Sequence, residues 1–267
     1  MFDWWQHTFM QYAFVAVLLI APLFSMLGTM VVGSGMAFFS DALGHSALTG
    51  VAIGVLCGLH SDSVAMMVFA VVFALLMNRI RHSRMTSTDT VIGVFSSCGM
   101  ALGLVILSRG GGFSRYQSLL IGDILGITRE ELVVLGIALA VTATVWGLLF
   151  NRLYAVSVSS TMARSKGMPV RLLDDLFVVL IAVVVMLAIR WVGMLVVNAM
   201  LILPAAAARN LAGNWRSYQA LTLMFSLFSG VTGLLLSYYN GVAATGPMII
   251  LVAAALFFGS FAMRKWT

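Results

Sequence analysis

An aspartate and a histidine four residues apart interrupt a long apolar stretch near the start of the chain. They are Asp41 and His45, within FFSDALGHSAL at residues 38–48. On an α-helix, positions i and i+4 lie one above the other, so both side chains would point the same way. A carboxylate oxygen and an imidazole nitrogen are ordinary ligands for zinc and similar divalent metals. The pair therefore predicts a weak cation site on a transport path, where incomplete coordination lets the ion leave.

A structural explanation competes with this one. Asp41 and His45 could hydrogen-bond to each other, or Asp41 could cap the start of its helix near the membrane surface. A carboxylate at the bilayer centre costs at least ~2.5–3.5 kcal/mol, however, and such residues usually face a cavity or a partner. Further candidate ligands are Thr49, one turn along the same face, Cys98 in the fourth apolar run and Asn198 in the seventh. Helix packing is the simpler explanation for Cys98 and Asn198.

A stripe of small residues lies roughly a hundred degrees round the same predicted helix. Its members recur every four positions and are Ser46, Gly50, Gly54 and Gly58. Small residues let membrane helices approach closely, which matters because lipid is as apolar as their side chains. We therefore expect one face of this helix to pack tightly against a neighbour and an adjacent face to line a path.

Composition places these residues in a membrane. Hydrophobic residues make up 61% and charged residues 9% of the 267 positions, against ~45–50% and ~25% in soluble domains. A spanning helix needs ~20 mostly apolar residues. Nine runs of that order occur, near residues 12–33, 36–58, 63–80, 89–108, 131–151, 173–190, 192–208, 217–238 and 247–263. The sixth run is short and the seventh follows it almost directly, so eight spans is the alternative.

The distribution of Lys and Arg predicts the orientation. With the N-terminus outside, all but four of the 15 cations fall in inner loops, the exceptions being Arg109, Arg115, Arg129 and Arg190. Cytoplasmic loops carry this excess, so we expect the N-terminus outside and the C-terminus inside. No internal repeat is apparent, and residues 1–267 are interpreted as a single transmembrane domain.

Motifs for nucleotide binding and proteolysis are absent from the sequence. Neither G-x-x-x-x-G-K-[ST] nor H-E-x-x-H occurs, so we expect the chain neither to bind ATP nor to be a common membrane metalloprotease. We predict a transport protein without a permanently bound cofactor rather than an enzyme. Its energy would come from a partner or from an ion gradient.

Four stretches resemble, in order, the permeases of metal-ion ABC importers, the class for zinc, manganese and iron chelates. They are SDALGHSALTGVAIG (40–54), TDTVIGVFSS (88–97), LLIGDILGITREEL (119–132) and WVGMLVVNAMLILPAAAARNLA (191–212). The resemblance implies a polytopic, all-α integral membrane protein with the type II, cobalamin-importer-like permease fold. It also implies a homodimer in the inner (cytoplasmic) membrane, paired with a cytoplasmic ATPase and an extracytoplasmic metal-binding protein. The transported ion would be zinc or manganese, with iron also open; nucleic acid is not an implied partner.

The resemblance also assigns roles to residues. The family's Asp-x-x-x-His pair falls on Asp41 and His45, as ion contacts on the path. Its ATPase-coupling segment maps to about residues 158–175, where Ala163 and Gly167 match the family's Ala-x-x-x-Gly and Lys166 and Arg171 join them as coupling residues. Where relatives carry an acidic stretch, this chain reads Val-Ser-Ser-Thr at 158–161. The alternative function is a stand-alone proton-coupled carrier or channel for cations, in which the Asp–His pair would relay protons.

Overall fold

The computed structural model describes residues 3–58, 62–82, 87–109, 122, 124–240 and 245–264. Among them, nine helices are long and apolar enough to cross a membrane, which matches the larger of the two predicted counts. The regular structure of the described residues is helical throughout, as predicted. The spanning helices are α1 (Thr8–Gly33), α2 (Phe39–Leu56), α3 (Asp62–Arg81), α4 (Thr88–Arg109), α7 (Arg129–Val158), α9 (Val170–Val192), α10 (Met194–Leu211), α11 (Trp215–Asn240) and α12 (Thr245–Met263). Shorter helices are η1 (Asp3–Gln6), η2 (Ile124–Gly126) and α8 (Ser160–Ser165).

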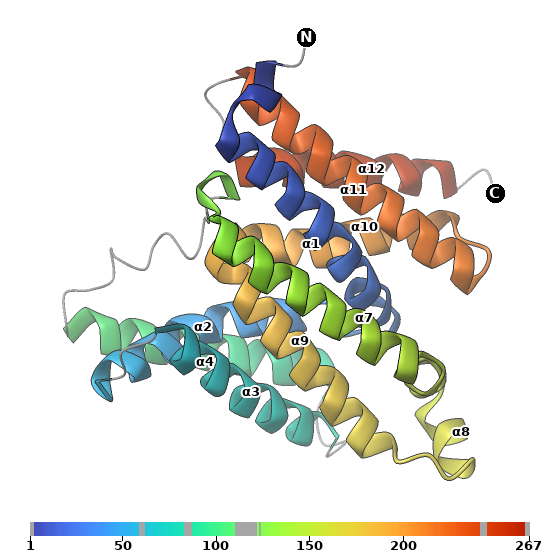
Figure 1. The fold of residues 1–267 in the computed structure, drawn as a ribbon. Helices are drawn as coiled ribbons and strands as arrows, with labels where there is room; N and C mark the ends of the chain where they lie inside the picture. The colour runs from blue at the N-terminus through green and yellow to red at the C-terminus, as the bar shows by residue number, and fades with distance from the viewer. Residues whose placement is uncertain are drawn as a thin grey trace. The chain divides into compact units, whose positions relative to one another are not determined.

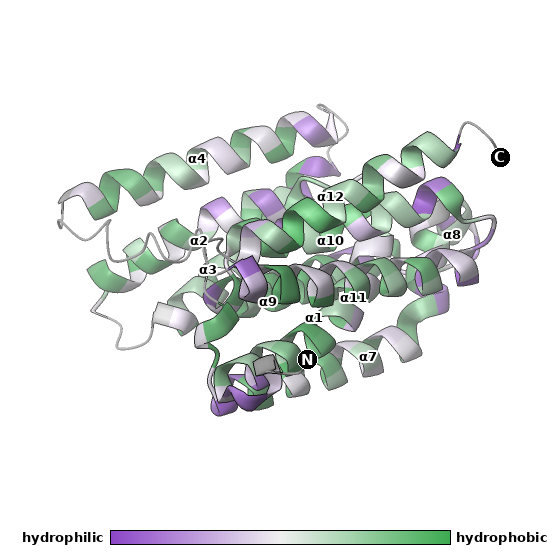
Figure 2. Ribbon diagram, turned by 90° about the horizontal axis from the view of Figure 1, so that it is seen from above, coloured by the Kyte–Doolittle hydropathy of each residue, from purple (hydrophilic) through white to green (hydrophobic). Residues whose placement is uncertain are grey.

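The chain forms two compact units. Unit 1 consists of Met1–Val32, Ile121–Gly147 and Trp191–Thr267, and unit 2 consists of Gly33–Leu120 and Leu148–Arg190. In both units, hydrophobic residues run along the helices and hydrophilic residues concentrate toward helix ends (Figure 2). This pattern is expected of spanning helices, because the hydrocarbon layer cannot solvate polar groups.

In unit 2, α2 packs against both α3 and α4 (Figure 1). Small residues make the contact with α3 possible. A Cβ atom on Gly50 would lie 2.9 Å from the Cα of Met66, and one on Gly54 would lie 2.5 Å from the Cβ of Ala65. Neither position has room for a side chain, so the two helix backbones approach as closely as small residues allow.

The contact of α2 with α4 uses the next face of the helix. Ser46 is fully buried there, and the Cα of Ser46 lies 3.5 Å from where a Cβ on Gly99 would be. One turn along, the hydroxyl of Thr49 donates a hydrogen bond to the backbone carbonyl of Gly99. A Cβ on Gly103 would lie 2.9 Å from the backbone nitrogen of Thr49. α2 therefore uses two neighbouring faces to pack against α3 and α4.

Gly58, predicted to continue the stripe of small residues, lies beyond the end of α2 instead. The helix ends at Leu56, and Gly58 adopts a φ of 66°, the left-handed conformation that commonly terminates helices. Its N–H donates to the carbonyl of Val55 at 3.2 Å. Among the described residues, no atom lies within 4 Å of the position that its Cβ would take. Gly58 therefore ends the helix and does not pack it.

In unit 1, α10, α11 and α12 pack against one another, and α1 packs against α10 (Figure 1). A Cβ on Gly28 of α1 would lie 2.2 Å from the carbonyl oxygen of Leu201, so the two backbones touch. At the end of α1, the guanidinium of Arg209 donates to the carbonyl of Val32 at 3.1 Å. This bond satisfies one of the carbonyls that a helix leaves unpaired at its last turn.

Candidate metal site and coupling segment

The predicted metal pair lies in the first two turns of α2. Because α2 begins at Phe39, Asp41 belongs to its first turn and His45 follows one turn later. His45 Nε2 is 3.5 Å from Asp41 Oδ2, and the two side chains are 21% and 39% exposed. That separation exceeds the about 2.7–3.2 Å of an N–H···O hydrogen bond. It is close to the ~3.4 Å expected between two ligands of one tetrahedral metal ion with bonds of ~2.0–2.1 Å.

The second ring nitrogen of His45, Nδ1, lies in a different environment from Nε2. Nδ1 is buried and has no hydrogen-bond partner among the described residues. A buried polar atom without a partner is unfavourable, and natural structures keep few of them. The ring is therefore not held in place by a hydrogen bond from Nδ1, although its Nε2 faces the carboxylate of Asp41.

The further candidate ligands are Thr49, Cys98 and Asn198. Thr49 is 1% exposed and directs its hydroxyl to Gly99 of α4. Cys98 is exposed on α4, and no three His, Cys, Asp or Glu side chains in the described part of the chain form a metal-binding group. Asn198 lies in α10, which belongs to unit 1. Within unit 2, the candidate site therefore consists of Asp41 and His45.

The predicted coupling segment contains a short capped helix, α8. Ser159 precedes it, and the Ser159 side chain accepts a hydrogen bond from the N–H of Met162 at 3.3 Å. Serine is among the preferred residues at this capping position because its oxygen satisfies an otherwise unpaired N–H. Part of the Val-Ser-Ser-Thr stretch at 158–161 that departs from the family pattern therefore has a structural role here. Ala163 is 2% exposed, so its side of α8 is buried.

The end of α8 explains the spacing between Ala163 and Gly167. The N–H of Met168 donates to the carbonyl of Ala163 at 3.1 Å, and the N–H of Gly167 donates to that of Arg164 at 3.0 Å. This pair of bonds is the Schellman motif, in which the residue after the helix cap takes a left-handed conformation. Gly167 has a φ of 73°. A glycine four residues after a buried alanine is therefore what this turn requires.

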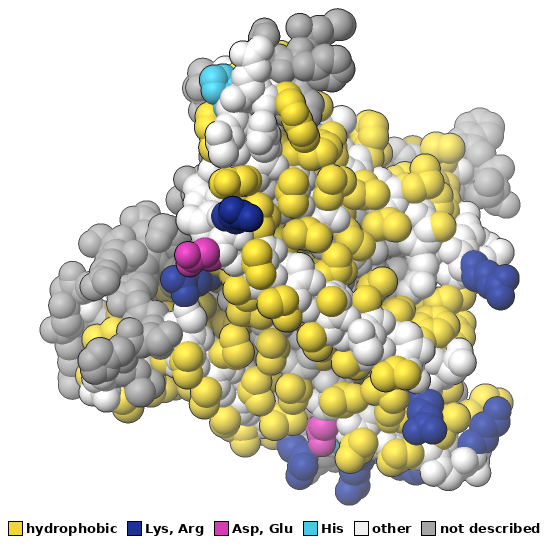
Figure 3. Space-filling model, viewed as in Figure 1, with side chains coloured by type: hydrophobic (Ala, Val, Ile, Leu, Met, Phe, Trp, Pro, Cys, Tyr) yellow, Lys and Arg dark blue, Asp and Glu magenta, His cyan; other side chains and the backbone are white. Residues whose placement is uncertain are grey.

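Basic side chains surround the turn. Arg164, Lys166 and Arg171 are all exposed. In the space-filling view, Lys and Arg gather at the lower edge, where Figure 1 shows α8 and the start of α9, whereas hydrophobic side chains cover the length of α9 (Figure 3). This distribution suits a surface at the boundary between membrane and water.

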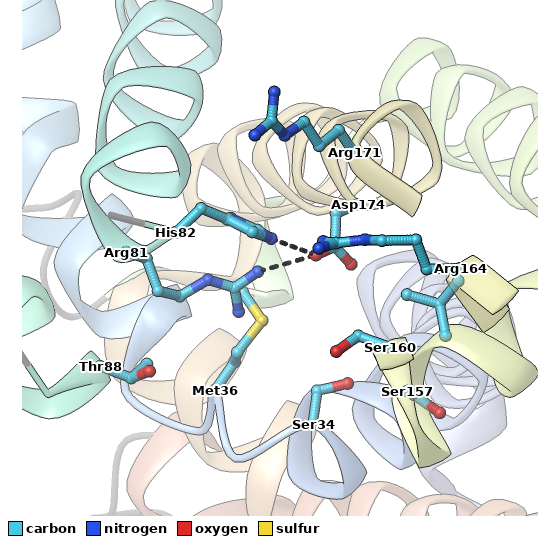
Figure 4. A pocket seen from close by; sticks show the side chains of 11 residues that line it. Ser34, Met36, Arg81, His82, Thr88, Ser157, Ser160, Arg164, Arg171 and Asp174 are labelled. Carbon is cyan, nitrogen blue, oxygen red and sulfur yellow. Dashed lines mark hydrogen bonds and ion pairs between the residues drawn. The ribbon is translucent and has the colours of Figure 1, made fainter. Parts of the chain in front are cut away.

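A pocket of about 500 Å³ lies beside α8 in unit 2 (Figure 4). Its lining includes Met36, which precedes α2, together with Arg81 and His82 at the end of α3 and Asp174 near the start of α9. In the close-up, Arg81 and His82 both point toward Asp174 (Figure 4). Met36 lies five residues before Asp41, so the end of α2 that carries the metal pair lies at the same end of unit 2 as the coupling segment.

Sequence reasoning misses the polar residues that meet at this pocket. It assigns Arg79 and Arg81 only to an inner loop, includes Asp174 and Asp175 in the coupling segment without a role of their own, and gives no role to Asn78. A signal exists: two adjacent carboxylates at the edge of an apolar run in a chain with only 9% charged residues. Charges in such a position are usually paired.

The spanning helices, the Asp–His pair in one of them and the capped helix beside a basic surface define a polytopic transport permease. The ABC 3 transport family matches residues 6–264, and the chain belongs to it. It is 30% identical over 256 residues to the high-affinity zinc uptake system membrane protein ZnuB of Haemophilus influenzae, covering 94% of each chain. It is 31% identical over 255 residues to the manganese transport system membrane protein MntC of Halalkalibacterium halodurans, covering 94% of this chain and 86% of that relative.

Solved structures agree with this assignment. The fold matches PsaBC from Streptococcus pneumoniae in complex with Fab with a TM-score of 0.82 and 29% identity, over 96% of this chain and 91% of that chain. The predictions of a metal-ion ABC permease fold and of a multi-pass membrane location are therefore confirmed.

Proposed function

We propose that this permease moves zinc or manganese into the cytoplasm and that Asp41 and His45 contact the ion on its way. The observation that carries the proposal is the 3.5 Å between His45 Nε2 and Asp41 Oδ2 on partly exposed side chains. Zinc, manganese and ferrous iron all accept this mixed ligand set. Relatives named for zinc and for manganese transport support the first two ions.

Two ligands from one chain leave the coordination of a divalent ion incomplete, since four is usual for zinc. A second copy of the chain, facing the first across the path, would supply an equivalent pair. Such a homodimer encloses the ion between two identical α2 helices. Water can replace either pair as the ion leaves, which keeps binding weak enough for release.

The energy would come from a separate cytoplasmic ATPase that docks on α8 and the following turn. Exposed Arg164, Lys166 and Arg171 surround this surface, and α8 is a compact helix with both ends capped. An extracytoplasmic metal-binding protein would deliver the ion to the opposite side. Rigid-body movement driven by ATP hydrolysis would then open the path to each side in turn.

The test measures uptake of radioactive zinc and manganese by cells that express the permease with its ATPase. We expect Asp41→Ala and His45→Ala each to lower uptake more than about 10-fold, with unchanged amounts of permease in the membrane. Ser108→Ala, which removes an exposed hydroxyl group from α4, is the control. Wild-type uptake by both variants would refute the ion-path assignment, and transport by the purified chain alone in liposomes would instead support the stand-alone carrier.

A further inference from the structure

Two adjacent carboxylates near the start of α9 form hydrogen bonds with side chains near the end of α3. Asp175 Oδ1 accepts a hydrogen bond from Asn78 Nδ2 at 2.7 Å, and Asn78 Oδ1 accepts one from Arg81 Nη2 at 2.8 Å. Arg81 Nη2 also lies 3.3 Å from Asp174 Oδ2. Asn78 is 2% exposed and the side chain of Arg81 is 14% exposed. These four side chains therefore form a largely buried network, unlike a solvated surface ion pair.

His82 completes the network on its outer side. His82 Nε2 lies 2.9 Å from Asp174 Oδ2 (Figure 4). Its Nδ1 lies 2.9 Å from the backbone oxygen of Asn78. Both ring nitrogens of His82 therefore lie within hydrogen-bond distance of an oxygen atom. Asp174 therefore lies beside both Arg81 and His82.

α3 and α9 are bonded at their opposite ends as well. The guanidinium of Arg190, near the end of α9, donates to the hydroxyl of Ser63, near the start of α3. The two helices therefore run antiparallel, with polar contacts at both ends. α9 cannot move along its axis without moving α3 or breaking bonds of the buried network.

Each of these helices connects to one of the proposed functional elements. Only four residues, 166–169, separate α9 from α8, and the turn at Gly167 followed by Pro169 restricts the angle between the two helices. On the other side, α3 touches the backbone of α2 at Gly50 and Gly54. A displacement of α8 can thus pass through α9 and α3 to α2.

We propose that Asn78, Arg81, Asp174 and Asp175 form a joint, called here the α3–α9 joint, that transmits movement of α8 to the helix that carries the metal pair. The proposal rests on the proposed function, because it requires an ATPase on α8 and an ion at Asp41 and His45. The four residues are not part of the proposed metal pair, so we regard them as positioning residues. Their loss should separate ATP hydrolysis from metal movement.

The test uses the permease–ATPase complex in liposomes, with ATP hydrolysis and metal uptake measured on the same preparation. Asn78→Leu removes both amide bonds and keeps a side chain of similar size at this buried position. We expect it to lower the amount of metal transported per ATP hydrolysed by roughly 10-fold or more. Asp175→Asn is the matched control, because its amide oxygen can still accept from Asn78, and we expect a ratio near that of the wild type.

An unchanged ratio in Asn78→Leu, or an equal fall in hydrolysis and uptake, would show that the network only supports the fold and would overturn the proposal. Should Asn78→Leu fail to accumulate, Asp175→Leu, which leaves Arg81 paired with Asp174, decides by the same ratio. Failure of the proposed function has a different signature. In that case the wild-type complex takes up no metal, or Asp41→Ala transports as well as the wild type, whatever the joint variants do.

Discussion

Thr49 of α2 donates a hydrogen bond from its hydroxyl to the backbone carbonyl of Gly99 in α4. Thr49 is 1% exposed, and Gly103 approaches its backbone one turn further along α4. A residue expected to extend the face of Asp41 and His45 therefore holds a helix interface. The two possible roles of Thr49 make opposite predictions.

Thr49→Val keeps the shape of the side chain and removes its hydroxyl. We expect a loss of about 0.5–1.5 kcal/mol of stability, near the lower value because hydrogen bonds between membrane helices average ~0.6 kcal/mol. Thermal unfolding in detergent measures the loss, while zinc and manganese uptake per folded permease should stay at the wild-type level. If uptake were lost while stability stayed unchanged, Thr49 would instead be assigned as a ligand on the ion path.

Gly50→Ala tests the close approach of α2 and α3. Its Cβ would lie 2.9 Å from the Cα of Met66, a backbone atom that cannot rotate away. We expect a destabilisation of about 1–3 kcal/mol, as for other overpacked interiors. Gly93→Ala on α4 is the control, because no described atom lies within 4 Å of the added Cβ. Equal melting temperatures for the two variants would contradict the packing described for α2.

Gly167→Ala tests the turn after α8. A non-glycine residue in the left-handed region costs about 1–2 kcal/mol, so the end of α8 should fray and the ATPase should co-purify less well with the permease. Gly213→Ala, in the turn between α10 and α11, has neither a positive φ nor a described neighbour within 4 Å and should behave as wild type. If the ATPase co-purified with Gly167→Ala as well as with the wild type, this turn would not be required for docking.

Met162→Ser tests the apolar part of the proposed docking surface. Met162 is 68% exposed on α8, and Leu172 is 65% exposed at the start of α9. Large exposed apolar side chains on a water-facing helix commonly mark a protein contact. Met162→Ser removes apolar area that docking of the ATPase would bury. We expect it to weaken ATPase binding about 10-fold, which corresponds to ~1.4 kcal/mol. Binding is measured with purified components, and Ser165→Ala on the same helix is the control that should leave the affinity unchanged.

Hydropathy predicts the spans well and their ends less well. The predicted run at 36–58 exceeds α2 (Phe39–Leu56) at both ends, because Met36 and Gly58 are apolar or small but lie in the flanking turns. A left-handed glycine is no more polar than a helical one, so hydropathy cannot mark it. The predicted run at 173–190 is shorter than α9 (Val170–Val192), because a charged residue such as Arg171 counts against a span although the helix includes it.

In the candidate site, contacts between residues close in the sequence are predictable, and contacts between distant residues are not. The i, i+4 spacing is enough to place Asp41 beside His45, since helix geometry alone brings them together. Asn78 and Asp175 are 97 positions apart, and no periodicity in the sequence relates them. Their pairing depends on how α3 and α9 pack. In the same way, the contact of Thr49 with α4 depends on how α2 and α4 pack.

Asn78 bonds through both ends of its amide, as a donor to Asp175 and as an acceptor from Arg81. Only the amides of asparagine and glutamine place an NH₂ donor and a carbonyl acceptor at two ends of one side chain, and Asn78 is buried. Substitution at this position in other members of the family should therefore be accompanied by substitution at the two carboxylates. A relative with an apolar residue here is expected to have lost the acidic pair of α9 during the same divergence, and comparison of many members would reveal that co-variation.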